Sequence, residues 1–264
     1  MAVSLPVLGA EAALAVLSRA GAVHSQGERT SGRSAVMEWR PSGELLAAAV
    51  KHAQPPTHVV ALYERNGLRH GQLALRDAAY AVADLKWNAT GDVLAVVLEA
   101  EGEAAAEAVA CKVQLWARGN YHWYLLWERC LPRSAHRVLV QWDREQPHTL
   151  HLVSATAALS LGFAWATVVS AQATAAVVDG HELQLTPFEV AVIPPPMAAT
   201  KLSLVAEERV CAVAWSAQGH VLLHTSSGAL ALVKVQRHTM PMAPPQLVAT
   251  VTCASVSTMS TMSS

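Results

Sequence analysis

Four side chains in one short segment have the residue types of a metal site. Asp143 and Glu145 precede His148 and His151, and imidazole nitrogens and carboxylate oxygens are common metal ligands. The segment from His148 onward has the apolar alternation of a β-strand, in which residues three apart face opposite sides of a sheet. Joint coordination by the two histidines would need a bend, so we expect no metal here.

The common short motifs of catalysis and cofactor binding are missing from the chain. It contains no G-x-G-x-x-G, Walker A, G-x-S-x-G or H-E-x-x-H pattern, so the mechanisms that these motifs encode lack their parts. Ser, His and Asp all occur, but a catalytic triad is a matter of geometry that composition cannot supply. We therefore expect no catalytic, cofactor-binding or metal-binding residue, and no small-molecule substrate.

The cysteines do not form a recognisable framework. Cys111, Cys130, Cys211 and Cys253 match neither the C-x2-C spacing of a zinc site nor a dense disulfide pattern. We interpret them as reduced, mostly buried thiols of an intracellular protein, which we expect in the cytoplasm, with the nucleus as a second location.

Charge and composition exclude several classes of protein. The 264 residues have a net charge of −1 and no dense block of basic residues, whereas nucleic-acid binding needs clustered positive charge. Apolar residues make up 52% and charged residues 15%, which is typical of a folded chain whose strands pack on both faces. No run of about 18 apolar residues indicates a transmembrane helix. We expect no direct contact with nucleic acid or membrane.

One phrase occurs four times: an apolar strand ending in Trp, a polar turn that usually carries Gly, and a second apolar strand. The tryptophans are Trp39, Trp87, Trp142 and Trp215. Their separations leave room for the ~40–45 residues of a four-stranded propeller blade plus loops. The pattern predicts an all-β chain of about three to four WD40-like, four-stranded antiparallel β-propeller blades, with the tryptophans in their cores.

The composition changes along the chain and suggests four segments. We expect an irregular or helical leader over residues 1–34, blades over 35–190, a Pro-rich crossing segment with the start of a second propeller over 191–236, and a low-complexity, disordered tail over 237–264. Glu11 and Arg19 argue against a secretory signal in the leader. Within the blades, Asn66-Gly67 and Asp179-Gly180 predict hairpins, the former with a type I′ turn.

The strand from Tyr121 to Trp127 is rich in aromatic residues. Because side chains alternate along a strand, Tyr121 and Trp123 would share one face and His122 and Tyr124 the other. An exposed row of Tyr and Trp would be a protein-binding hot spot, and a row inside a blade would be core. We favour the core, with both faces covered.

The residues between the tryptophans resemble those of a known family, the largest subunit of the Elongator complex, called IKAP in animals. The resemblance rests on ordered motifs over about residues 33–236: Trp39-Arg-Pro-Ser-Gly43, Glu64-Arg-Asn-Gly67-Leu-Arg-His70-Gly71, Leu85-Lys-Trp87-Asn88, Val113-Gln-Leu-Trp116, Gly119-Asn-Tyr-His-Trp-Tyr-Leu125, Val177-Val-Asp179-Gly180 and Val192-Ile-Pro-Pro-Pro-Met197.

The resemblance implies a scaffold rather than a catalyst. Family members carry two N-terminal WD40-like propellers and a long helical region that dimerises, and they hold the subunits of an assembly that modifies the wobble uridine (U34) of tRNAs. Catalysis there belongs to another subunit, a radical SAM and acetyltransferase-like enzyme. This chain would be a fragment, holding the end of the first propeller and the start of the second, with other Elongator subunits as partners. The alternatives are a WD40-like adaptor of another pathway or an enzyme on a propeller scaffold.

Overall fold

The structure is a computed structural model, and every regular element in it is a β-strand. It describes residues 3–4, 13–17, 20–29, 33–53, 56–75, 78–101, 109–132, 137–165, 168–205, 208–235 and 244–252. The all-β prediction is confirmed over these ranges. In the same ranges there is no helix that is long and apolar enough to cross a membrane. The chain divides into two compact units, Met1–Trp116 with Cys130–Ala164 and Ala117–Arg129 with Trp165–Ser264.

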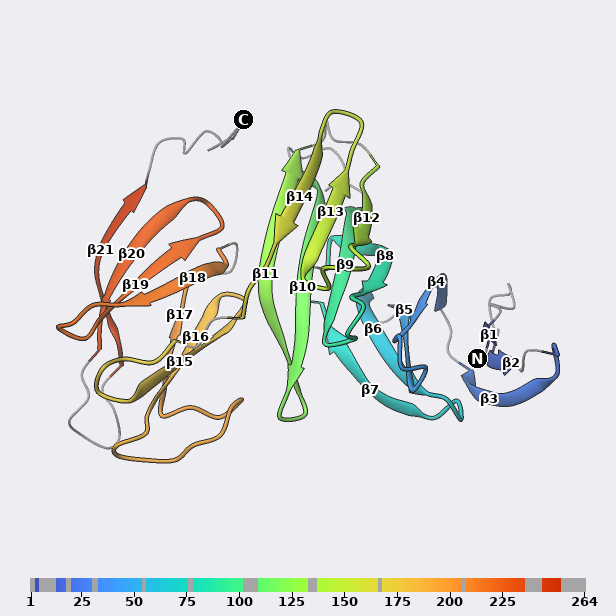
Figure 1. The fold of residues 1–264 in the computed structure, drawn as a ribbon, viewed down its shortest axis with the longest axis horizontal. Helices are drawn as coiled ribbons and strands as arrows, with labels where there is room; N and C mark the ends of the chain where they lie inside the picture. The colour runs from blue at the N-terminus through green and yellow to red at the C-terminus, as the bar shows by residue number, and fades with distance from the viewer. Residues whose placement is uncertain are drawn as a thin grey trace. The chain divides into compact units, whose positions relative to one another are not determined.

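The first unit is built from sheets whose strands follow one another in chain order (Figure 1). They form a three-stranded sheet β1-β2-β3, two four-stranded sheets, β4 to β7 and β8 to β11, and a three-stranded sheet β12-β13-β14. The strands are β1 Val3–Ser4, β2 Ala13–Leu17, β3 Val23–Arg29, β4 Arg33–Trp39, β5 Leu45–Ala53, β6 Pro56–Glu64, β7 Arg69–Ala74, β8 Tyr80–Trp87, β9 Val93–Ala100, β10 Val109–Gly119, β11 His122–Pro132, β12 Leu139–Trp142, β13 Thr149–Val153 and β14 Ala158–Gly162. The tip of the β10–β11 hairpin is grouped with the second unit.

The second unit continues the same plan with a three-stranded sheet β15-β16-β17 and a four-stranded sheet β18-β19-β20-β21. Its strands are β15 Thr174–Asp179, β16 Glu182–Pro187, β17 Thr200–Ser203, β18 Val210–Trp215, β19 His220–Thr225, β20 Ala229–Lys234 and β21 Gln246–Thr252. Neighbouring strands in both sheets of this unit pair antiparallel. Sheets of consecutive antiparallel strands are the arrangement that repeated hairpins predict.

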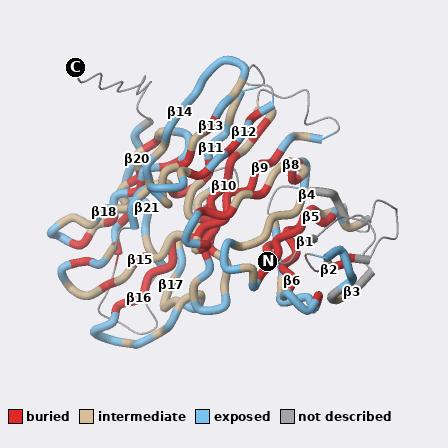
Figure 2. The backbone as a smooth tube through the Cα atoms, turned by 45° about the vertical axis from the view of Figure 1, so that its right-hand side comes forward, coloured by how far each residue is buried: buried red, intermediate tan, exposed pale blue. Residues whose placement is uncertain are grey.

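Inner strands of the sheets are buried on both faces. Residues Val93 to Leu98 of β9 are all buried, and so are Leu45 to Val50 of β5, which Figure 2 shows as continuous red segments. Around β5, the side chains of Leu46, Ala48 and Val50 pack with those of β6 in one cluster. The apolar runs that the sequence places after each tryptophan are therefore core strands.

The Trp phrase corresponds to one recurring turn. In three of the four phrases the residue after Trp accepts a hydrogen bond from the turn glycine: Gly43 to Arg40 (2.7 Å), Gly91 to Asn88 (3.0 Å) and Gly219 to Ser216 (3.0 Å). The three glycines have φ of 71°, 71° and 82°, a region that residues with a Cβ rarely adopt. The glycine of the phrase is thus fixed by backbone conformation.

Two segments expected to lack regular structure contain strands. In the leader, Ala13–Leu17 and Val23–Arg29 form β2 and β3, which pair antiparallel, so the expectation of an irregular or helical leader is wrong there. In the tail, Gln246–Thr252 forms β21, which pairs with β20 from Ala229 to Lys234. In both segments the strands are ordered by backbone pairing with a neighbouring strand, which was not expected from the sequence. Residues 236–243 and 253–264 lie outside the described residues.

The structure also contains more sheets than the four phrases predict, six among the described residues. The sheet β12–β14, which contains the third phrase, is separate from the sheet β15–β17 that follows it in the chain. The boundary expected at 190/191 falls between β16 and β17, which pair in one sheet. The phrase identifies a sheet only by a strand that ends in Trp. The sheets β1–β3 and β15–β17 contain no such strand, which explains the lower count.

Both predicted hairpins are present, although the first has a different turn. Strands β6 and β7 are joined through Asn66-Gly67, where Gly67 has a φ of 86° and Asn66 is not in the positive-φ region. A type I′ turn needs positive φ at both central residues, so that assignment is wrong. The amide of Gly67 bonds to the carbonyl of Glu64 at 2.9 Å, and the glycine ends a longer loop.

Candidate interaction surface and the networks that support it

The two histidines considered for a metal site contact different carboxylates, and only one of these, that of Asp143, belongs to the four candidate side chains. His148 Nε2 lies 3.3 Å from Asp92 Oδ2, and His151 Nε2 lies 3.2 Å from Asp143 Oδ2. No group of three or more His, Cys, Asp or Glu side chains that could hold a metal is found among the described residues. The two histidines bind different carboxylates, as the strand geometry predicts for positions three apart.

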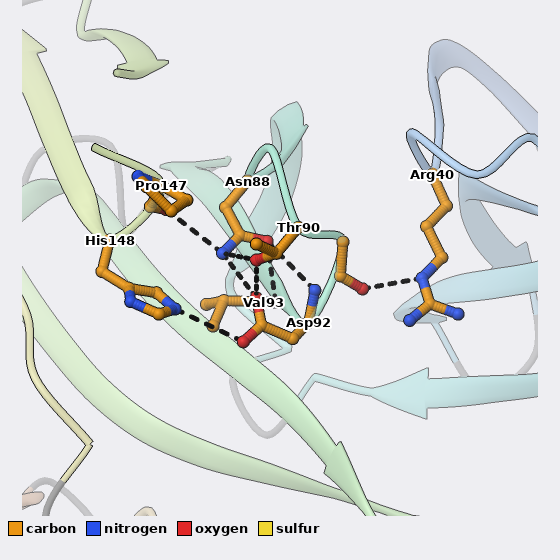
Figure 3. A network of polar contacts seen from close by, with 8 residues as sticks. Arg40, Asn88, Thr90, Asp92, Val93, Pro147 and His148 are labelled. Carbon is orange, nitrogen blue, oxygen red and sulfur yellow. Dashed lines mark hydrogen bonds and ion pairs between the residues drawn. The ribbon is translucent and has the colours of Figure 1, made fainter. Parts of the chain in front are cut away.

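Asn88 is the centre of a polar network in the first unit (Figure 3). Its side chain is fully buried. The amide nitrogen donates to Thr90 Oγ1 (2.9 Å), Asp92 Oδ1 (2.6 Å) and the carbonyl of Pro147 (3.2 Å). The amide oxygen accepts from the backbone N–H groups of Asp92 and Val93, both at 3.1 Å. One side chain therefore closes its own turn and holds the β12–β13 turn beside it.

Asp92 carries the charge of this network. Burial raises the pKa of its carboxyl, but hydrogen bonds from Thr90, Asn88 and His148 outweigh that effect and lower the pKa to about 2. A carboxylate that accepts several hydrogen bonds is stabilised in its charged form. Asp92 is therefore ionised at neutral pH. Its contact with His148 joins the turn after Trp87 to the turn after Trp142.

The β4–β5 turn joins the same network through Arg40. Arg40 Nε donates to the carbonyl of Gly91 at 2.7 Å, and its guanidinium carbon lies 5.9 Å from the centre of the Trp87 ring. A Cβ added to Gly91 would lie 2.9 Å from Arg40 Cγ and Nε. Gly91 is thus required both by its φ and by the close approach of Arg40.

The tryptophans of the phrase lie in or against the core, as predicted. Trp87 and Trp142 are buried, and the indole nitrogen of Trp142 donates to the carbonyl of Lys86 at 2.9 Å. Trp39 and Trp215 are half-buried and pack against the core clusters of their units. The tryptophans of the four phrases are thus core or core-contacting side chains.

In the second unit, Asp179 plays a role similar to that of Asn88. Its side chain is 2% exposed; one oxygen lies 3.0 Å from His122 Nε2 and the other accepts from the backbone N–H of Leu125 at 3.2 Å. Gly180, with a φ of 66°, donates to the carbonyl of Leu125 at 2.8 Å. The Asp-Gly turn of the β15–β16 hairpin therefore fixes the N-terminal half of β11.

A buried ion pair fixes the other half. Arg209 Nε lies 3.5 Å from Glu128 Oε1, and the two side chains are 3% and 1% exposed. The backbone N–H of Arg209 donates to Ser226 Oγ at 3.0 Å. Removing one partner of such a pair leaves an uncompensated buried charge, so Glu128 and Arg209 must be kept together.

The turn that precedes β11 presents Tyr121 to solvent. Tyr121 is 89% exposed and lies in the turn, where Asn120 and Tyr121 have φ of 48° and 62°. The expectation that Tyr121 packs with Trp123 on a strand face is wrong, because the turn removes it from the strand. Tyr124 and Leu125 are buried as expected. Burial and the charge of Asp179 raise the pKa of Tyr124.

The β16–β17 loop adds further exposed apolar side chains beside this turn. Asn120 Nδ2 donates to the carbonyl of Pro195, and in the same loop Val192 is 83% exposed and Met197 60%. The guanidinium carbon of Arg118 lies 5.3 Å from the centre of the Tyr121 ring. We call Tyr121, Val192 and Met197 the tip surface. Tyr and Arg are the residue types that dominate protein–protein binding energies.

Three cysteines fall within the described residues. Cys111 is buried, Cys211 is half-buried and Cys130 is exposed, whereas Cys253 lies outside the described residues. The expectation of mostly buried thiols holds for Cys111 and not for Cys130. None of these three is joined in a disulfide in the structure.

Comparison with protein families finds two matches in succession along the chain. Residues 1–145 match the family described as ELP1 first N-terminal beta-propeller, and residues 177–264 match the family described as ELP1 N-terminal second beta-propeller. Both matches confirm the β-propeller prediction and extend it into the leader and the tail.

Curated relatives agree with the family matches. Elongator complex protein 1 of Schizosaccharomyces pombe is 35% identical over 205 residues, which cover 74% of this chain and 15% of the relative. The protein of the same name from Oryctolagus cuniculus is 37% identical over 72% of this chain and 15% of its own length, and that of Arabidopsis thaliana is 33% identical over 70% and 14%. The chain thus spans about 15% of the length of the relatives it matches.

Proposed function

The chain belongs to the Elongator complex protein 1 family, and we propose that it is a non-catalytic scaffold segment that binds other Elongator subunits. Through these contacts it would support modification of the wobble uridine (U34) of tRNAs, acting in the cytoplasm or the nucleus. The family match and the identity to relatives from fungi, animals and plants support this assignment.

The observation that carries the proposal is the tip surface. Tyr121 is 89% exposed at a backbone conformation that costs a tyrosine ~1–2 kcal/mol, and its ring is contacted by the Arg118 guanidinium. Asp179, Glu128 and Arg209 fix the strand behind it. A rigid, exposed aromatic residue is what a protein-binding anchor requires, because little entropy is lost when it is buried by a partner.

The proposal is tested by removing the chain from cells and measuring wobble-uridine modification in their tRNAs by nucleoside mass spectrometry. We expect the modified fraction to fall, and to recover when the wild-type chain is supplied. A variant with Tyr121→Gly and Met197→Ser should be expressed but restore less modification. Full recovery with a chain that binds no Elongator subunit would overturn the proposed mechanism.

A further inference from the structure

Strands β10 and β11 form a hairpin with a two-residue turn. The positive φ of both Asn120 and Tyr121 is the signature of a type I′ turn, which places the residues on either side of it opposite each other. Gly119 therefore lies opposite His122. Eight positions further from the turn on each strand (119 minus 111, and 130 minus 122) are Cys111 and Cys130, so the two cysteines are cross-strand partners.

Two further observations agree with this pairing of the strands. It places Gly119 and Tyr124 diagonally on one face, and a Cβ added to Gly119 would indeed lie 3.3 Å from Tyr124 Cε2. At the other end of the hairpin, burial, the charge of Glu99 and the nearby Cys130 together raise the pKa of the Cys111 thiol to about 12. An effect of Cys130 on Cys111 requires that the two thiols be close.

The pairing also has the backbone geometry of a disulfide. Residues that flank a two-residue turn form a hydrogen-bonded pair, and such pairs alternate with non-hydrogen-bonded pairs along a hairpin. An even number of steps makes Cys111 and Cys130 a hydrogen-bonded pair as well, with Cα atoms ~5.5 Å apart. Disulfides span Cα separations of ~4.4–6.8 Å, so the Cα separation of this pair lies in the range of a disulfide.

We propose that Cys111 and Cys130 form a reversible cross-strand disulfide, made by exchange with a small-molecule disulfide such as oxidised glutathione. The exposed Cys130 thiolate attacks one sulfur of oxidised glutathione and displaces glutathione as a thiolate, which leaves a mixed disulfide on Cys130. The Cys111 thiolate then attacks the Cys130 sulfur and displaces the second glutathione. The two cysteine thiols lose two protons and two electrons, and oxidised glutathione becomes two thiols.

The two cysteines have unequal parts in this exchange. Cys130 is exposed and meets the oxidant first, whereas Cys111 is buried. Because the thiolate is the attacking species, the high pKa of Cys111 makes the second step slow at neutral pH. The rate of ring closure from the mixed disulfide should rise about tenfold for each unit of pH between about 7 and about 9.

The disulfide would link β10 to β11 at the end of the hairpin that is farther from the turn with Tyr121. Cross-linking shortens the open loop of the unfolded chain, so oxidation should raise the Tm by about 5 °C. The bond is reversible in a reducing compartment, where it would form only when the glutathione pool becomes oxidised.

The test is a redox titration of the full chain in mixtures of reduced and oxidised glutathione, followed by alkylation and tryptic mapping without reductant. Trypsin cuts after Lys86, Lys112, Arg129 and Arg133, so the bridge joins the peptide 87–112 to the peptide 130–133. We expect this linked pair to lose two hydrogens relative to the separate peptides and to return to them with excess reduced glutathione. Cys211→Ser is the matched control and should leave the linked pair unchanged.

Cys130→Ser replaces an exposed side chain, so it should fold with the Tm of the reduced wild type and lose the oxidation-dependent rise. A chain that carries glutathione on Cys130 at every pH but never gives the linked peptides would overturn the proposal. So would a bridge from Cys130 to Cys211 or Cys253, or a chain that resists oxidation entirely.

Discussion

Replacing Tyr121 with glycine should separate binding from stability at the tip surface. A left-handed conformation costs a residue with a Cβ ~1–2 kcal/mol, and Tyr121 has a φ of 62°. Glycine removes that cost and restores the Asn-Gly pair that type I′ turns prefer. It also adds ~0.5–1 kcal/mol of unfolded-state entropy and loses an exposed contact with Arg118 of ~0.5 kcal/mol.

The sum predicts that Tyr121→Gly changes the free energy of unfolding by between about −0.5 and about +1 kcal/mol, where a positive value is stabilising. For a chain of this size that is a Tm rise of at most about 4 °C. An exposed aromatic anchor at a binding surface is worth ~2 kcal/mol or more to the complex. Affinity for Elongator subunits should therefore fall by at least about tenfold while stability is kept.

The assay pairs thermal unfolding followed by circular dichroism with a titration against purified Elongator subunits. Leu68→Ala is the matched control, because Leu68 is 64% exposed but belongs to the first unit, whereas the tip surface belongs to the second. It should leave the affinity unchanged. A Tm that falls by more than about 4 °C in Tyr121→Gly would refute the strain at the turn, and unchanged affinity would refute the role of the tip surface.

The remaining predictions concern the Asn88 network. Gly91→Ala should lower the free energy of unfolding by more than ~1–2 kcal/mol, and by more than Gly43→Ala in urea unfolding, since both glycines have a φ of 71° but only at Gly91 would an added Cβ meet the Arg40 side chain. Asn88→Ala should cost ~2–4 kcal/mol, because it leaves the buried N–H of Val93 without its acceptor, whereas alanine at the exposed Asn66 should cost under ~0.5 kcal/mol. The lowered pKa of Asp92, about 2 against 3.8, stabilises the folded state above about pH 4, and this contribution is lost as the pH falls toward about 2. Acid unfolding of Asp92→Asn should lack that part of the pH dependence; an identical profile would exclude Asp92 as its source.

Local features of the fold could be predicted from the sequence, and contacts between distant segments could not. The turn glycines Gly43, Gly91 and Gly219 follow from the spacing after each Trp, because the chain reverses within a few residues. The bond from Asn88 to Pro147 joins residues 59 apart in sequence, and no local pattern indicates which side chain a turn will meet. Strand β3 was missed because its polar residues show no apolar alternation, and its order comes from pairing with β2.

At the tip surface, too, the sequence shows the composition of a segment but not the position of each side chain. The aromatic composition of β11 is visible in the sequence, but whether Tyr121 is buried depends on where the strand begins. A shift of one residue moves a side chain from strand to turn, and the two-residue loop after Gly119 puts Tyr121 in the turn. The adjacent Asn120 was the available signal, since Asn is among the residues that tolerate positive φ.

The most direct test of the scaffold assignment is co-purification of the tagged full chain with Elongator subunits from cells, with a full-length Elongator complex protein 1 relative as the positive control. We predict that the chain recovers at least one other Elongator subunit, and that Tyr121→Gly recovers at least about tenfold less of it. Recovery of the complex by the full-length relative and of no subunit by this chain would contradict the account.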